Sequence, residues 1–269
     1  EDSVLEITAP DAAIVLGGNR RLPLKSFRLS GTDLDKPGTL ADVSMRIQTP
    51  LAQAVEAIDQ PALELLKQSG VVLDGAEGKV EGQIKLAMPV GDEFDRSLIR
   101  AEGKVKVSDG RMKQVGGSLD VQGAGVTFEF SDKAIDAKGE MLVNGVPAKL
   151  TWQRIFDAPP DKQPPVRLTM VLDNADRNQL GLDVNHMMQG EVPVEVTVSR
   201  GPQGDSLVRM RADLTNAELN VDTIAWRKPA GRSAYVQFDI VKGRTAKYEL
   251  QNLQLAGDDI AIEGSASLG

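Results

Sequence analysis

The sequence predicts a mainly β protein, built from antiparallel meanders that form a curved, groove-like sheet with two short helical insertions. Apolar and polar residues alternate at period two through most of the chain, which is typical of strands with one apolar and one wet face. The breaks between these runs carry Gly, Asn, Asp and Pro, the residues of tight turns. Glycine makes up 26 of 269 residues, above the usual ~7 %, and this suits many short connections.

The N-terminal part is predicted to hold four strands and then a helical insertion. The strands fall near 4–7, 13–16, 24–29 and 40–47. Thr49 followed by Pro50 provides a capping residue and a proline at the first helical position, so a helix is predicted over 50–59. Pro61 interrupts it, and a second short helix is predicted over 61–69, ended by Gly70.

The middle of the chain returns to strands. Period two holds from Lys79 to Arg154, and Asn144-Gly145 is its clearest hairpin turn. The segment 157–165 contains four prolines and is predicted to be a surface loop. A strand is expected over 166–172. A helix over about 175–188 follows it, capped by Asp173 or Asn174 and ended by Gly190.

The C-terminal stretch from Ser206 to Leu268 predicts one long meander whose apolar side must be covered. The whole chain is expected to form a single elongated segment. Pseudo-repeats about 1–156 and 166–269, joined by the proline-rich loop, share the order strand, helix, meander. The chain starts at Glu1 without a signal segment and has no apolar run of ~18 residues, so we expect it to be an excised part of a longer protein.

Charge and composition argue against several functions. The net charge is −8, and no cluster of Lys and Arg suits a nucleic-acid backbone; Arg227-Lys228 is expected to be a solvated pair in a turn. There is no cysteine, and the chain has no nucleophile, nucleotide or metal motif. We therefore expect no catalytic residue, no metal and no cofactor. His186, the one histidine, is expected to be a surface or packing residue.

Carboxylates are grouped in predicted turns, where Asp commonly bonds its own backbone. The group Asp92, Glu93 and Asp95 leaves open a carbohydrate-active β protein that uses these carboxylates. The aromatic content of 4 % argues against sugar-stacking platforms.

Two segments carry a family resemblance. The first is ADLTNAELNVDTIAWRKPAGRSAYVQFDI (212–240) followed by LQNLQLAGDDIAIEGSASL (250–268), and the second is GTLADVSMRIQTPLAQAVEAIDQP (38–61). They resemble the AsmA-like envelope proteins (YhdP and TamB types), the YhdP-like subgroup most closely. The resemblance implies a repeating β-groove in the periplasm of a Gram-negative bacterium, part of a protein anchored in the inner membrane outside this chain. It also implies that the groove conducts phospholipids towards the outer membrane and that the protein is not an enzyme.

The residue pattern fits such a groove, because an aliphatic face left open binds acyl chains without directional partners. A closed sandwich or barrel would use the same residues as ordinary core. A chaperone or structural scaffold in outer-membrane protein assembly, which adds strands of its partners to its sheet edges, also stays open. The residues expected to line a lipid groove share the apolar face of their strands: Ile84, Leu86, Met88, Val105, Val107, Val194, Val196, Val198, Met210, Leu214, Val236, Phe238 and Ile240.

Overall fold

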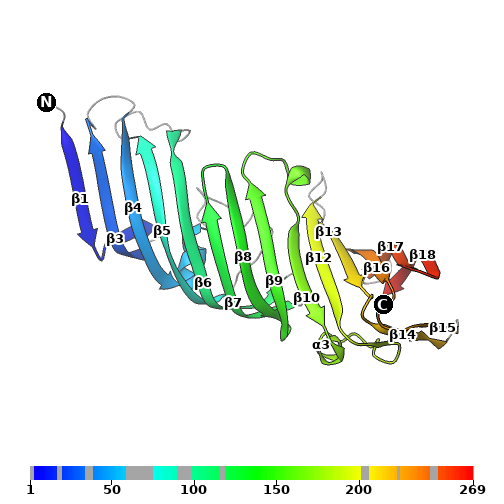
Figure 1. The fold of residues 1–269 in the computed structure, drawn as a ribbon. Helices are drawn as coiled ribbons and strands as arrows, with labels where there is room; N and C mark the ends of the chain where they lie inside the picture. Colours follow the sequence, from blue (N-terminus) through cyan, green and yellow to red (C-terminus); the bar gives the residue numbers. More distant parts are fainter. Residues whose placement is uncertain are drawn as a thin grey trace. The chain divides into compact units, whose positions relative to one another are not determined.

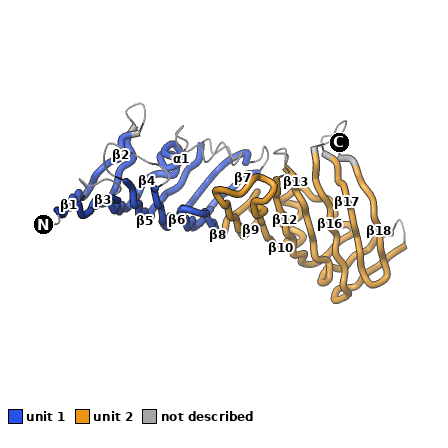
Figure 2. Tube along the Cα trace, turned by 90° about the horizontal axis from the view of Figure 1, so that it is seen from above, with its two compact units in different colours: residues 1–139 blue, residues 140–269 orange. Residues whose placement is uncertain are grey.

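The computed structural model describes residues 3–16, 20–33, 39–58, 75–89, 98–115, 119–200, 206–222, 225–242 and 248–268. The chain divides into two compact units, 1–139 and 140–269 (Figure 2). The proline-rich loop 157–165 lies inside the second unit, between β9 and β10. The expected pair of pseudo-repeats stays a prediction.

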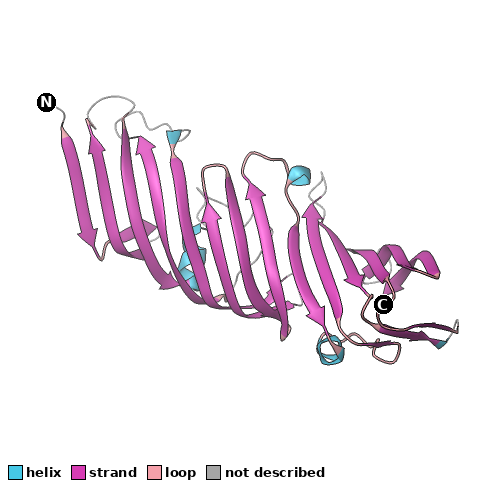
Figure 3. Ribbon diagram, in the orientation of Figure 1, coloured by secondary structure: helices cyan, strands magenta, loops and turns pink. Residues whose placement is uncertain are grey.

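The protein is mainly β, with every assigned strand pair antiparallel, as predicted (Figures 1 and 3). One sheet of 15 strands is open, with β1 and β18 as its edges, and a second sheet has three strands. Strand neighbours in the large sheet nearly all follow the order of the chain, so most connections are hairpins.

In the first unit the strand order is β1, β3, β4, β5, β6, β7, and β2 pairs with one end of β3. The long strands β3 to β7 contain the alternating runs that were predicted, but β3 and β4 are longer than the predicted 24–29 and 40–47. The bounds are β1 Val4–Pro10, β2 Ala13–Leu16, β3 Arg20–Thr32, β4 Leu40–Pro50, β5 Glu77–Pro89, β6 Arg100–Val115 and β7 Leu119–Phe130. Strand β8, Ala134–Val143, crosses the division between the units.

In the second unit the large sheet continues in the order β9, β10, β12, β13, β16, β17, β18. The hairpin that starts it turns at Asn144 and Gly145, both with positive φ (48° and 86°), which confirms the Asn-Gly prediction. The bounds are β9 Val146–Ile155, β10 Val166–Leu172, β12 Val192–Arg200, β13 Ser206–Asp213, β16 Ala234–Lys242, β17 Tyr248–Gly257 and β18 Ile260–Leu268.

A three-stranded sheet interrupts the predicted C-terminal meander. Strands β11 (Met188–Gln189), β14 (Glu218–Val221) and β15 (Trp226–Lys228) form it. The chain thus leaves the large sheet after β13 and returns at β16, where Leu214 N–H donates to the carbonyl of Ala234 at 2.8 Å. The expectation of a simple meander from 206 to 268 is therefore wrong for residues 214–222 and 225–233.

The first predicted helix is present as α1, Leu51–Ile58. Pro50 ends β4, so the helix begins one residue later than predicted, and Thr49 Oγ1 donates to Gln53 Oε1 at 2.8 Å. The helix predicted over 61–69 lies outside the described residues.

The second predicted helix is much shorter than expected. Helix α3 covers Asn174–Gln179 and is capped by Asp173, whose side chain accepts the N–H of Asp176 at 2.8 Å. Gly181, at φ 75°, follows the helix and takes the left-handed conformation that ends it. The expected helix to residue 188 is therefore wrong, and residues 182–188 form turns that lead into β11. A 3₁₀ turn, η3 (Pro160–Lys162), lies in the proline-rich loop.

Candidate functional site

The first unit gathers its apolar side chains on one face of β3 to β7. Because paired residues of antiparallel strands point to the same face, the register defines rows that run across the strands. Three rows carry most of this face: Leu29, Val43, Leu86, Ala101; Phe27, Met45, Ile84, Gly103, Phe130; and Leu24, Ile47, Gly82, Val105, Phe128. The predicted residues Ile84, Leu86, Met88 and Val105 are half-buried on this face.

Three similar rows cross the second unit. They are Ala148, Met170, Val194, Ala212, Val236, Leu255, Ile262; Leu150, Leu168, Val196, Met210, Phe238; and Val166, Val198, Val208, Ile240, Leu250, Ala266. The predicted residues Val196, Val198, Met210, Val236, Phe238 and Ile240 are half-buried here.

Each face is covered at one end of its strands. In the first unit α1 contacts β3, β4 and β5, and Leu51 packs with Val80 and Val107. In the second unit Leu180, Met188, Leu219 and Trp226 pack over the strand ends. We call this covering segment, residues 173–191, 214–222 and 225–233, the cap.

Three of the predicted lining residues are buried and belong to these packed ends. Val107 packs in the core near α1, whereas Val194 and Leu214 lie in the core beneath the cap, where Leu214 is 2 % exposed. Leu214 also follows the end of β13 and is not a strand residue. The other ten predicted residues keep exposed surface, so the candidate face is the part of each sheet away from its cover.

The opposite faces are charged. Ion pairs join neighbouring strands there: Lys85–Glu102 (3.0 Å), Lys104–Glu129 (2.6 Å) and Arg167–Glu195 (2.7 Å). The hydrogen bond from Lys104 lowers the pKa of the Glu129 carboxyl below its usual value. These exposed pairs add little to stability, but they mark the face that meets water.

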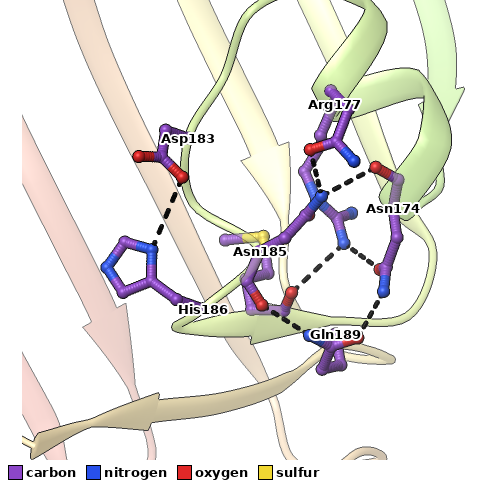
Figure 4. Close-up of polar contacts among 8 residues, drawn as sticks. Asn174, Arg177, Asp183, Asn185, His186 and Gln189 are labelled. Carbon is purple, nitrogen blue, oxygen red and sulfur yellow. Dashed lines mark hydrogen bonds and ion pairs between the residues drawn. The ribbon is translucent and has the colours of Figure 1, made fainter.

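An arginine holds the cap together (Figure 4). Arg177, on α3, is 2 % exposed and donates to the carbonyls of Leu172 (3.0 Å) and Gly190 (2.9 Å) and to Asn185 Oδ1 (2.7 Å). It also bonds Asn174 Oδ1. Burial lowers its pKa, while Asp173 and Asp176 raise it. One side chain thus ties the helix to the turns that follow, which a local pattern could not predict.

A lysine ties the other half of the cap. Lys228 is 2 % exposed, and its Nζ donates to the carbonyls of Thr215 (3.1 Å), Ala217 (2.8 Å) and Pro229 (3.0 Å). Burial lowers its pKa. The prediction of a solvated Arg227-Lys228 pair is wrong for Lys228, since its ammonium group is buried and donates to these three carbonyls; Arg227 is exposed.

The remaining polar candidates do not assemble a reaction centre among the described residues. His186 Nδ1 lies 3.8 Å from the carboxylate of Asp183, and both are exposed beside the Arg177 network (Figure 4). Asp258 and Asp259 pair with Arg232 at 3.5 and 3.2 Å. Asp92, Glu93 and Asp95 lie outside the described residues.

A depression of about 330 Å³ lies in the first unit around charged residues of both signs. Its cations are Arg28, Lys85 and Arg100, and its acids are Asp42, Glu102 and Asp132. Lys85 and Glu102 form an ion pair, and Arg100 lies 3.7 Å from Asp132. The charges balance within the depression, so it offers no net attraction to an ion.

Within the described ranges, no helix has both the length and the apolar character needed to cross a membrane. The same residues contain no group of three His, Asp or Glu side chains placed to hold a metal ion. Comparisons with protein-family models, with curated proteins and with solved structures found no match.

Proposed function

We propose that the half-buried apolar face of each unit binds the acyl chains of phospholipids, and that the chain is a non-enzymatic, lipid-conducting segment. The observation that carries this is the separation of faces. Rows such as Leu150, Leu168, Val196, Met210 and Phe238 are aliphatic or aromatic on one face, while ion pairs occupy the other.

Acyl chains suit this surface. They need apolar area and no directional hydrogen bonds, and burial contributes ~0.8 kcal/mol per CH₂ group. A row without polar side chains also binds different acyl chains with similar affinity. A protein that conducts mixed phospholipids needs this low selectivity. A large contiguous apolar patch that stays exposed on a protein surface usually marks a binding site.

The setting belongs to the same proposal. The sequence resemblance to AsmA-like envelope proteins supports a location in the periplasm of a Gram-negative bacterium, with an inner-membrane anchor outside this chain. In that setting each face would carry phospholipids towards the outer membrane.

The test uses two neighbouring residues on opposite faces of β12. Val198 pairs with Val166 and Val208 on the apolar face, and Ser199 points to the other face. We would incubate the purified chain with phosphatidylcholine vesicles and measure bound lipid by native mass spectrometry. Wild type and Ser199→Asp should carry phospholipid, and Val198→Asp should lose most of it because a carboxylate on an apolar surface is costly to desolvate.

Thermal unfolding of both variants checks that each is folded. A wild-type chain that carries no lipid, or equal losses in the two folded variants, would refute the proposal.

A second candidate, a scaffold that binds outer-membrane proteins by strand addition, has one observation in its favour. Strand β1 is a sheet edge, and its Val4, Leu5 and Ile7 are exposed. Such an edge can pair with an extended segment of a partner. Crosslinks from a photoreactive residue at position 5, but not from one at position 198, would favour this function over lipid binding.

A further inference from the structure

Strand β1 is an open edge of the large sheet in the first unit (Figure 1). Among the described residues it pairs only with β3, in an unbroken register from Val4↔Thr32 to Pro10↔Ser26. Unpaired edge strands are usually protected by lysines, by bulges or by being very short. β1 has seven residues, no Lys and no register shift. It is therefore a regular template on which a further strand can pair.

The backbone groups that face the open side belong to every second residue of β1. The N–H of Asp33 donates to the carbonyl of Ser3 at 2.7 Å, so this carbonyl points towards β3. Since backbone groups alternate in direction along a strand, those of the odd-numbered residues of β1 also point towards β3. The even-numbered residues direct their backbone groups to the open side, and these residues are Val4, Glu6, Thr8 and Pro10.

The side chains of β1 extend both faces of the sheet to its edge. Ile7 pairs with Leu29, so the odd-numbered side chains lie on the apolar face. Ile7 is 47 % exposed at the end of the apolar row that Leu29 belongs to. On the other face Glu6 forms an ion pair with Arg28 at 3.1 Å. The one charged side chain within β1 is thus neutralised, and the edge repels no incoming strand.

The strand is complementary to itself. When two copies of β1 run antiparallel with Ile7 opposite Ile7, every residue of the strand has a partner. The outward N–H and C=O groups then meet across the seam, and the N–H that proline lacks falls at the ends. Apolar residues face apolar residues, and the charged residue faces a neutral polar one. The pairs beside the central one are Leu5 with Ala9, Glu6 with Thr8 and Val4 with Pro10.

The neighbouring register is less favourable. If the two strands slide so that Glu6 lies opposite Glu6, like charges meet directly, which is destabilising. Pro10 then also moves beyond the last residue of its partner strand. The charge and the strand length therefore both favour a centre at Ile7.

We propose that β1 pairs with β1 of a second copy of this chain, in a symmetric antiparallel dimer centred on Ile7. A two-fold contact of this kind uses the same surface on both copies and closes at two. Residues directly opposite each other share a face, so the apolar rows of the two first units join through Leu29 and Ile7. This inference goes beyond the proposed function and does not depend on it.

The other edge of the large sheet, β18, is a poorer template. Its pairing with β17 shifts register between Leu250 and Leu253, and the strand contains Gly264, which weakens a strand interior. A contact between β1 of one copy and β18 of the next would join two different surfaces. Such a contact does not close at two copies and adds further copies in a row.

The first experiment measures the mass of the purified chain by sedimentation equilibrium, without lipid, over a range of concentrations. Wild type should form a reversible dimer. Thr8→Pro removes one outward N–H from each copy and should raise the Kd about 30-fold, the effect of two hydrogen bonds. Edge strands tolerate proline where the N–H faces away from the sheet. Thr8→Val keeps the N–H and should keep the wild-type Kd, and thermal unfolding checks that both variants are folded.

The second experiment tests the register with single cysteines, because the chain has none of its own. In Ile7→Cys the two new thiols lie opposite each other, with Cα atoms about 4.5–5.5 Å apart, which suits a disulfide. Val4→Cys is the control. Val4 is 73 % exposed, more than Ile7, but its two copies lie about 20 Å apart along this seam. Mild oxidation should give covalent dimers of Ile7→Cys and not of Val4→Cys.

Each other outcome overturns the proposal. A wild-type chain that stays monomeric up to about 1 mM has no such dimer, and an unchanged Kd in folded Thr8→Pro shows that β1 is not the seam. Equal crosslinking at positions 7 and 4 contradicts the register, and assemblies larger than two copies indicate β1 against β18. Neither experiment contains lipid, so a failure here leaves the proposed function standing.

Discussion

Arg209 on β13 and Asp239 on β16 face each other across the strand pair and form a two-pronged ion pair. Nε lies 2.7 Å from Oδ1 and Nη2 lies 3.0 Å from Oδ2. The Asp239 side chain is 4 % exposed, and Asn252 donates a third hydrogen bond to it at 2.8 Å. Asn252 sits at φ 52° in an irregularity of β17, so a strand distortion supplies a donor to a buried carboxylate.

We expect this ion pair to make the free energy of unfolding depend on pH in the acid range. The hydrogen bond from Arg209 lowers the pKa of Asp239 below the ~3.9 of an unfolded chain. The stabilisation is therefore present above about pH 4 and is lost as the pH falls through the folded-state pKa. Urea unfolding of wild type and Asp239→Asn should show it. The variant should lose about 1–2 kcal/mol at pH 7, because Arg209 is half exposed.

The difference in unfolding free energy between wild type and Asp239→Asn should shrink below pH 4, where Asp239 becomes protonated. The other carboxylates are common to both proteins and cancel in this difference. A difference that stays constant from pH 7 to pH 3 would contradict the assignment of this pH dependence to Asp239.

The close contact between Gly103 and Phe130 should make a larger side chain at position 103 destabilising. They pair across β6 and β7, and a Cβ at Gly103 would lie 2.5 Å from Cζ of Phe130 and 2.7 Å from the carbonyl oxygen of Gln83. Gly103→Ala should therefore cost about 1–3 kcal/mol of unfolding free energy, as overpacking does. Chemical denaturation measures it.

Gly125 is the matched control, because it lies on β7 and a Cβ there meets no atom within 4 Å. Gly125→Ala should be neutral or slightly stabilising, since it reduces the freedom of the unfolded chain. Equal losses of unfolding free energy at positions 103 and 125 would show that the contact with Phe130 does not cause the destabilisation.

Replacing Lys228 should destabilise the cap. Lys228→Met fills similar volume but removes the ammonium donor from the carbonyls of Thr215, Ala217 and Pro229. The Thr215 carbonyl keeps the N–H of Gly231 at 2.8 Å. We expect a loss of about 1–3 kcal/mol for each buried acceptor left without a partner, up to the stability of the cap. Hydrogen exchange should quicken at 214–233, with little change in β9 and β10.

The neighbouring Arg227 is exposed and bonds Asn220 at 3.0 Å. Arg227→Ala should change exchange in this segment only slightly. A cap that exchanges as slowly in Lys228→Met as in wild type would mean that apolar packing alone holds it.

The sequence predicted features that depend on near neighbours. Period two identified the long strands, and Asn144-Gly145 identified a hairpin, because both express local backbone preferences. The helix expected over 175–188 failed because Gly181 ends it and because Arg177 ties the following turns to distant carbonyls. Those partners are 5 to 13 residues away, beyond any periodic pattern.

The candidate face was predicted only in part, because periodicity is a local signal. Alternation shows which residues share a face, as for Val196 and Val198, but not what lies over them. Val194 and Leu214 therefore turned out to be core.

The order of the strands has a consequence for how the protein unfolds. In the second unit each strand of the large sheet from β9 to β17 pairs with the strands before and after it in the sheet, and β18 is the edge. Such an array resembles a one-dimensional chain of interfaces, in which stability is a sum of neighbour terms and the ends open first. We expect β17 and β18 to exchange their amides well before β10 and β12, which are pinned by the cap, so a single melting temperature would describe neither part.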